Sequence, residues 1–226
     1  REAADLRGYT VVDPITVLVT HLKETIYKSS YELLGRQEVK QLLEGIKDKY
    51  GVVIDELIPD ILRLGEVQKV LQNLLKESIP INDLVTILET LADYGNTTKD
   101  IEMLTEYVRQ SLKRTIVKPY LDEQNVLQVV TIFPDTEELI TRSIQKSSAG
   151  SIPILQPETV TKIFDSITAI HNQLSARGIP HVLLASPKVR PAMKNLISYN
   201  FPDLTVVSLN EVPNDIPIET VGMING

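Results

Sequence analysis

The apolar residues of this sequence change their spacing once along the chain, and this change constrains the fold more than any other feature. From residue 13 to about residue 120 they recur with the 3.6-residue period of an α-helix. One run fits the i, i+3, i+4, i+7, i+8 template without a miss: Val67, Val70, Leu71, Leu74 and Leu75. After residue 125, short β-rich runs alternate with helical ones. The sequence therefore predicts an α+β fold, a helical subdomain followed by a small α/β sheet subdomain.

The helical part is predicted to span residues 13–121, including a linking helix at its end. Three acidic residues stand where helix N-caps are expected: Asp13, Asp83 and Asp100. Pro14 fits the first turn of a helix, where its missing N–H costs nothing. Gly35 predicts the end of the first helix. Pro59 predicts that only a short turn precedes it.

Residues 1–12 are predicted to be the remnant of one or more preceding subdomains. A short helical stretch leads through Gly8 into Tyr9-Thr10-Val11-Val12, which has the composition of a strand. No other strand is expected within reach, and a lone strand is not stable by itself. We therefore expect its partners before Arg1 or in another chain, and the sequence to be a piece of a longer protein.

The α/β subdomain is predicted to occupy residues 122–226, with a boundary near 121–125. The expected strands are 126–133, buried on both faces, then 181–185, 204–208 and an edge strand at 218–224. The expected helices are 134–145, 157–176 and one that Ser186-Pro187 caps and that runs to about residue 200. Residues 147–151 are predicted to form a flexible loop.

Composition excludes several functional classes. The net charge is −7 and the pI about 5.1, which argues against a surface that binds nucleic acid. The chain has no cysteine, which excludes disulfides, thiolate nucleophiles and Cys-ligated metals. No apolar run approaches the roughly 18 residues of a membrane-spanning helix.

A search for catalytic chemistry returns little, and the sequence predicts no catalytic residue, no metal site and no cofactor. The phosphate-binding, dinucleotide-binding, zinc-protease and nucleophile-elbow motifs are absent from the sequence. Its three histidines, His21, His171 and His181, fall on separate predicted elements without metal-ligand spacing. Glu137-Glu138 fits the first turn of a helix better than a pair of acid–base carboxylates. Ser186-Pro187 fits a helix cap better than an anion site.

Several stretches together resemble the cytoplasmic part of the type III secretion export-gate family, in particular its flagellar branch. They cover 8–14 (GYTVVDP), 20–22 (THL), 32–38 (ELLGRQE), 69–75 (KVLQNLL) and 86–91 (TILETL). The resemblance is most specific over residues 8 to 115 and stays in step to the end of the chain. It also covers Arg36-Gln37-Glu38, which composition alone would take for a solvated helix start with a weak ion pair.

The resemblance implies a function that periodicity does not show. In this family an N-terminal membrane half forms an export channel, and the cytoplasmic half, on the cytoplasmic face of the bacterial inner membrane, assembles into a homo-oligomeric ring. The implied partners are flagellar export chaperones with bound substrates, export ATPase components and other export-gate proteins. The resemblance implies no enzymatic activity.

The resemblance also implies the binding residues. Chaperones of the family dock in an apolar dimple, and the positions that match its wall are Val12, Val17 and Thr20. Pro80 matches a further position linked to export. Read without the family, Val12 and Val17 fit ordinary core packing equally well.

Two other functions remain open at this point. The first is the export gate of a virulence-type system, which the neighbouring genes would distinguish. The second is an enzyme built on the α/β subdomain, which requires a pocket at the carboxyl ends of the strands. Ser186 and Lys188 are the few polar residues expected there.

Overall fold

The structure is a computed structural model that describes residues 12–147 and 150–226. It divides into two compact units, residues 1–82 and 83–226. The predicted strand in 9–12 lies outside the described residues except for Val12. The predicted boundary near residue 121 falls within the second unit and stays a prediction.

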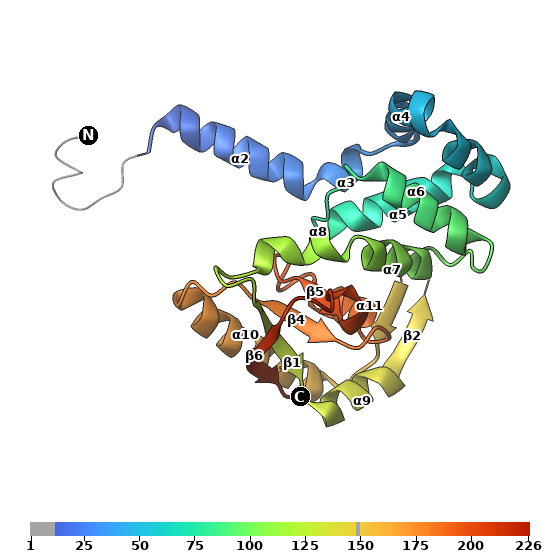
Figure 1. The fold of residues 1–226 in the computed structure, drawn as a ribbon. Coiled ribbons are helices and arrows are strands. Elements are labelled where there is room, and N and C mark those ends of the chain that lie inside the picture. Colours follow the sequence, from blue (N-terminus) through green and yellow to red (C-terminus); the bar gives the residue numbers. More distant parts are fainter. Residues whose placement is uncertain (1–11, 148–149) are drawn as a thin grey trace. The chain divides into compact units, whose positions relative to one another are not determined.

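The first unit is helical (Figure 1). It contains α2 (Pro14–Lys28), α3 (Ser30–Leu33), α4 (Arg36–Glu56), the π-helical turn η1 (Leu57–Ile61) and α5 (Leu64–Lys76). Its core is aliphatic, as the scarcity of aromatic residues requires, and the most buried side chains include Val39, Leu57, Leu62, Val67, Val70, Leu71 and Leu74. The helical period of the sequence placed Val39 and the four residues of α5 on buried faces, whereas it did not single out Leu57 and Leu62.

The prediction of a short turn before Pro59 was wrong. The regular helix α4 continues to Glu56, with a kink at Tyr50 (φ −127°, ψ 28°), and Pro59 lies in the π-helical turn that follows. A proline lacks the N–H that would bond the carbonyl four residues earlier, and its ring clashes with that carbonyl, so its effect is confined to about one turn. The residues before that turn can remain helical, and α4 ends three residues before Pro59.

The second unit begins with three helices, α6 (Leu84–Gly95), α7 (Ile101–Ser111) and α8 (Lys113–Val117), followed by the 3-10 turn η2 (Lys118–Tyr120). The predicted caps are confirmed: Asp83 accepts from the N–H of Thr86, and Asp100 accepts from the N–H groups of Glu102 and Met103. Each cap satisfies backbone donors that the helix itself leaves unpaired.

A four-stranded parallel sheet in the order β5-β4-β1-β6 forms the α/β part. Its strands are β1 (Leu127–Ile132), β4 (Val182–Ala185), β5 (Val206–Ser208) and β6 (Ile218–Ile224), separated by α9 (Pro134–Ser143), α10 (Pro157–Ala176), α11 (Arg190–Ile197) and the turn η3 (Leu209–Glu211). One face packs on the apolar side chains of α9, α10 and α11. The alternate side chains of β1 and β4 are also buried, as expected for a parallel sheet. The α+β fold class is confirmed.

A hairpin replaces much of the predicted flexible loop. Residues 144–147 form β2 (Ile144–Ser147), which pairs antiparallel with β3 (Gly150–Pro153), so the preceding helix ends at Ser143. Gly150 has a φ of 115°, a conformation that glycine adopts without strain. Ser151 is buried because it contacts α7, where its N–H donates to Glu102. The local sequence could not reveal this contact. The helix expected to begin at Ser186 begins at Arg190 and ends at Ile197.

Four charges, three of them buried and that of Glu106 mostly buried, connect α7 to the α/β elements of the second unit. The guanidinium of Arg109 (α7) donates from Nε and Nη2 to the carboxylate of Glu211 (η3), at 2.5 and 3.0 Å, and from Nη2 to the carbonyl of Val206 at 3.0 Å. On the same helix, Glu106 accepts from Nε of Arg190 at 2.6 Å. We call Glu106, Arg109, Arg190 and Glu211 the charge quartet.

The quartet yields a stability prediction. Arg109→Met leaves the Glu211 carboxylate, which is fully buried, without its charged partner. We expect a loss of about 3–5 kcal/mol in the free energy of unfolding, measured by urea denaturation. The double variant Arg109→Met with Glu211→Leu should regain much of the lost free energy of unfolding, because it no longer contains the unpaired carboxylate. Arg114→Met is the control, since its partner Asp215 and Arg114 itself are exposed, and it should change stability little. Equal losses in both single variants would contradict the prediction.

Candidate functional site

The first element of the candidate site is α2, and its start follows from its capping sequence. A side-chain oxygen of Asp13 accepts from the backbone N–H of Thr16 at 3.2 Å, and Pro14 occupies the first turn. The helix ends at Ser29, whose N–H donates to the carbonyl of Thr25 at 3.0 Å. The predicted helix start is therefore confirmed, whereas the helix ends well before Gly35, which is instead the N-cap of α4.

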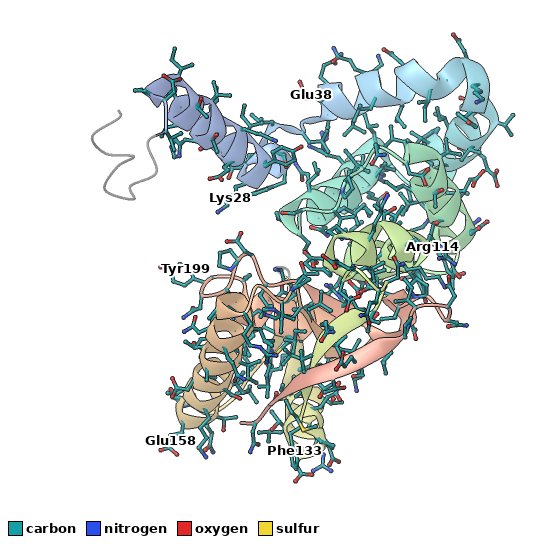
Figure 2. The ribbon with its side chains drawn as sticks, turned by 60° about the vertical axis from the view of Figure 1, so that its left-hand side comes forward. Lys28, Glu38, Arg114, Phe133, Glu158 and Tyr199 are labelled. Carbon is teal, nitrogen blue, oxygen red and sulfur yellow. The ribbon has the colours of Figure 1, made fainter. Side chains whose placement is uncertain are left out.

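None of the residues of α2 is buried within the described part of the chain. The large apolar side chains that it exposes are Ile15, Val17, Leu18, Val19, Leu22, Ile26 and Tyr27. Figure 2 shows side chains projecting from several sides of this helix, which ends near the labelled Lys28. An apolar surface of this kind on one helix is typical of a segment that binds another protein segment.

The predicted binding residues fall into two places. Val17 and Thr20 are three positions apart on α2 and so share a face, and Val12 lies just before the cap. The exposed fraction is 50% for Val12 and 54% for Val17, so within the described residues neither belongs to a core. Pro80 lies on a different element, in the exposed segment between α5 and α6, after the buried Ile79.

Thr20 is exposed, and its hydroxyl makes no hydrogen bond within the described residues. Thr25, one and a half turns further on, instead donates to the carbonyl of His21 at 2.8 Å. The predicted site therefore consists of one helical face with a small polar residue in it.

A shallow open hollow next to this region was not expected from the sequence. It is lined by Ser30, Leu33, Leu34, Glu38, Gln41 and Leu42 of α3, α4 and their connection. Glu38 belongs to the Arg36-Gln37-Glu38 stretch, and the exposed Leu33 contributes apolar surface. The leucine pairs Leu33-Leu34 and Leu42-Leu43 were the signal in the sequence that could have indicated it.

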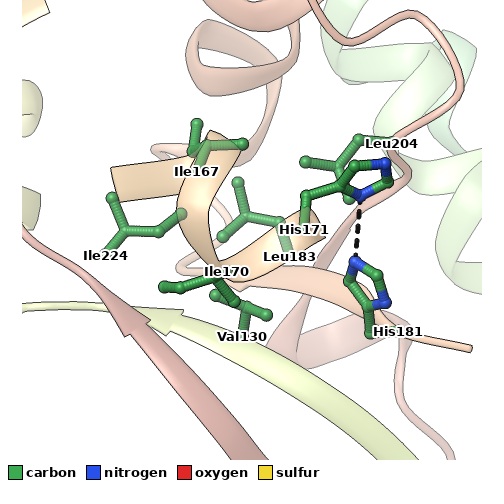
Figure 3. A pocket seen from close by; sticks show the side chains of 8 residues that line it. All are labelled: Val130, Ile167, Ile170, His171, His181, Leu183, Leu204 and Ile224. Carbon is green, nitrogen blue, oxygen red and sulfur yellow. Dashed lines mark hydrogen bonds between the residues drawn. The ribbon is translucent and has the colours of Figure 1, made fainter. Parts of the chain in front are cut away.

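The structure brings together two histidines that the sequence placed apart (Figure 3). Nδ1 of His171 (α10) lies 3.1 Å from Nε2 of His181, which precedes β4. Nδ1 of His181 lies 2.9 Å from the carbonyl of Ile179, which can only accept, so this nitrogen carries the proton. The two histidines flank the tight turn at Gly178, and this spacing was the signal that could have found them.

The surroundings of the two histidines do not resemble a catalytic site. They line a cavity of about 10 Å³, room for roughly one water molecule, and the other six lining residues are apolar: Val130, Ile167, Ile170, Leu183, Leu204 and Ile224. No nucleophile or carboxylate is among them. Within the described ranges, no group of three or more potential metal ligands lies close together.

The carboxyl end of β4 was the expected place for an enzyme pocket. There the N–H of Ser186 donates to a carboxylate oxygen of Glu137 at 2.7 Å. The carboxylate of Glu137 thus accepts the hydrogen bond that the N–H of Ser186 would otherwise offer to an anionic substrate. Lys188 is exposed in the turn that follows. Glu137 therefore does more than favour the start of α9, which was its predicted role.

A perturbed carboxyl group in the second unit belongs to the charge quartet. Burial raises the pKa of Glu106 to about 7, although the positive charges of Arg190 and Arg109 act in the opposite direction. Such a group in a cleft would be a candidate acid or base. Glu106 instead faces Arg190 in a buried ion pair, so a structural role explains it.

The N-terminus of α7 holds the hairpin through two acidic side chains. Nζ of Lys146 (β2) donates to Asp100 at 2.6 Å, and the carboxylate of Glu102 accepts from both the N–H and the hydroxyl of Ser151 (β3). The hydrogen bond from Lys146 lowers the pKa of Asp100, with its capping hydrogen bonds acting in the same direction. Asp100 therefore both caps α7 and binds Lys146 of the hairpin, so its carboxylate couples the cap to the position of the hairpin.

Comparison with known proteins gives the family. The model of the FHIPEP family matches residues 1–217. The chain belongs to the FHIPEP family.

Among the relatives of this FHIPEP chain, the flagellar biosynthesis protein FlhA of Bacillus subtilis is 42% identical over 225 residues, 100% of the chain and 33% of the relative. FlhA of Salmonella typhimurium is 32% identical over 226 residues, again 100% of the chain and 32% of the relative. The chain thus spans about a third of the length of these relatives.

Two solved structures have the same fold. The Chlamydia pneumoniae CdsV protein in complex with CdsO has a TM-score of 0.88 and 34% identity, covering 100% of this chain and 66% of that one. Nonameric SctV-C from EPEC has a TM-score of 0.84 and 32% identity, covering 99% and 67%. Among the helices described for this FHIPEP chain, none is both long and apolar enough to cross a bilayer.

The shifted pKa of Asp100 leads to a pH prediction. Because its pKa is lower in the folded than in the unfolded chain, the ionised carboxylate adds stability above about pH 3.9, and this contribution is lost as the pH falls through the lower, folded-state pKa. Asp100→Asn should therefore flatten the fall in unfolding free energy as the pH is lowered below about 4. We expect a difference below about 1 kcal/mol, because Lys146 is exposed.

Urea denaturation at several pH values measures this effect. Lys146→Met is the matched variant, since it removes the main cause of the shift but keeps the cap, and it should also flatten the acid dependence. If the fall in unfolding free energy at low pH is unchanged in both variants, other carboxylates cause it and the prediction is wrong.

Proposed function

We propose that this chain is a protein-docking part of a type III secretion export gate of the flagellar kind. The partners would be flagellar export chaperones with their bound substrates, components of the export ATPase and other export-gate proteins. The single observation that carries the proposal is the exposed apolar surface of α2, which contains Val17 and Thr20 and directly follows Val12. A helix that presents apolar side chains without burying them needs a covering partner.

The relatives support the assignment to the export gate. They carry the name flagellar biosynthesis protein, and the identity to the Bacillus subtilis protein is higher than that to the CdsV or SctV structures. The second candidate, a virulence-type gate, is the one that those solved structures favour. Membrane spans encoded upstream of Arg1 would be expected for either gate, whereas flagellar genes next to this one would be expected for the first candidate.

Assembly with other chains is part of the same proposal. The solved structure of the CdsV protein contains CdsO as a partner, and SctV-C and EscV were solved as nonamers. We propose that the full-length protein forms a comparable ring at the cytoplasmic face of the inner membrane. Docking and assembly need surface complementarity, not a reactive group, so no enzymatic step is part of the proposed function.

Thr20→Met tests the docking face. A small residue there leaves room for an incoming apolar side chain, which a methionine would fill. We expect chaperone–substrate binding by the full cytoplasmic part to weaken by at least about 1.4 kcal/mol, a tenfold loss. The melting temperature should change less, because an exposed helix face accepts a larger side chain with little strain. Isothermal calorimetry with a flagellar export chaperone bound to its substrate measures the affinity.

Thr25→Met is the matched control. Thr25 is an exposed threonine of the same helix, about 140° around the axis from Thr20, and the substitution is the same. It should leave the affinity within about twofold. Equal affinities of wild type and Thr20→Met, with both folded, would show that Thr20 does not belong to the docking site.

A further inference from the structure

The connection between α2 and α4 is short and leaves carbonyl groups without helical partners. α2 ends at Lys28, Ser29 has φ −103° and ψ 10°, and the four-residue helix α3 follows directly. The carbonyls at the end of so short a helix cannot accept from later N–H groups of the same helix. Those of Tyr31 and Leu34 therefore need donors from elsewhere.

Two glutamines of α5 supply these donors. Nε2 of Gln72 donates to the carbonyl of Tyr31 at 3.1 Å and to that of Leu34 at 2.9 Å. Nε2 of Gln68 donates to the same carbonyl of Leu34, also at 2.9 Å. The two glutamines are four positions apart and so lie on one face of α5.

The helix that carries these glutamines is firmly held. Its opposite face contributes Val67, Val70, Leu71 and Leu74, all fully buried, to the core. Leu34 is itself buried, and Nζ of Lys76 (α5) lies 5.3 Å from the ring centroid of Tyr31. One side of the connection is thus fixed to a rigid element by directional bonds.

The other side of the connection is α2, which buries no residue in the described chain. Apolar packing within these residues therefore contributes little to its direction. That direction depends on the corner at Ser29, where the hydroxyl of Ser30 donates to the carbonyl of Tyr27 at 2.9 Å, and on the bonds that hold α3 to α5. Of the glutamines, Gln72 alone bridges both carbonyls.

We propose that Gln72 is a positioning residue: it fixes α3, the joint between α2 and α4, to α5 and thereby holds the α2 face in the orientation in which it binds partner proteins. The link to binding rests on the proposed function, whereas the joint itself does not. A side chain of the same size that cannot donate would leave the two carbonyls unsatisfied. The joint would then sample several angles.

Distances between spin labels test the joint directly. The chain has no cysteine, so pairs of labels can be introduced without removing native residues. Cysteines replacing the exposed Glu24 (α2) and Lys69 (α5) report on the joint, and cysteines replacing Lys40 (α4) and Lys69 report on the helical core. We expect Gln72→Met to broaden or shift the first distance distribution and to leave the second unchanged.

Three further variants make the result specific. Gln41→Met is the matched control, an exposed glutamine of α4 without a hydrogen bond among the described residues, and should change neither distribution. Gln68→Met, which leaves both Gln72 bonds in place, should have a smaller effect. Gln72→Glu at pH 8 replaces the donor by an acceptor of the same size and should broaden or shift the first distribution as Gln72→Met does. It takes the place of Gln72→Met in the test if Gln72→Met does not fold.

The outcomes separate the joint from the docking function. An unchanged Glu24–Lys69 distribution in folded Gln72→Met or Gln72→Glu overturns the proposal, and so does an equal change in the Lys40–Lys69 pair. We also expect chaperone binding by the full cytoplasmic part to weaken at least threefold in Gln72→Met. A broadened distribution with unchanged affinity would uphold the joint and overturn its link to docking, whereas Thr20→Met tests the docking function by itself.

Discussion

The second unit depends on charges that are buried and fully paired. Taking the four charged groups of the quartet out of water costs free energy that only close, hydrogen-bonded partners offset. Arg109 has both a carboxylate and the Val206 carbonyl as acceptors, and Glu211 also accepts from the N–H of Ser208 at 2.8 Å. These bonds are directional, so they fix α7 at one position along β5 and η3, which an apolar contact would not. One of them also satisfies the carbonyl of Val206 on the edge strand β5, a group that could otherwise pair with another chain.

The first unit differs from the second in where its apolar side chains lie and in the kind of hydrogen bonds that join its elements. Its core is aliphatic, but α2 leaves large apolar side chains exposed, and α3, which follows α2, is joined to the core by neutral hydrogen bonds from Gln68 and Gln72. Neutral hydrogen bonds contribute only about 1 kcal/mol each. A joint of this kind can hold a direction and can also yield when a partner binds, whereas the charge quartet cannot shift without leaving a buried charge unpaired.

Much of the fold could be predicted from local patterns, because helical periods and caps are local effects. Asp13, Asp83 and Asp100 were correctly predicted as caps, and the helix of residues 157–176 was predicted with its observed bounds. The errors arose where distant residues decide. Ser151 was placed in a flexible loop because its partner Glu102 is 49 positions away, and Arg109 and Glu211 are 102 positions apart. The candidate site came from the family resemblance, since exposure of Val17 cannot be read from a sequence that suits a core equally well.

The way in which polar groups are paired also bears on what the second unit can do. In open α/β sheets ligands bind beyond the carboxyl ends of the strands, where backbone N–H groups and side chains are free. Here the N–H of Ser186 is taken by Glu137, Glu106 is taken by Arg190, and the cavity beside His171 is lined by apolar residues and has room for roughly one water molecule. Polar groups that bind one another stabilise the unit but leave few to bind a substrate. The docking function proposed for this chain draws instead on exposed surface, that of α2.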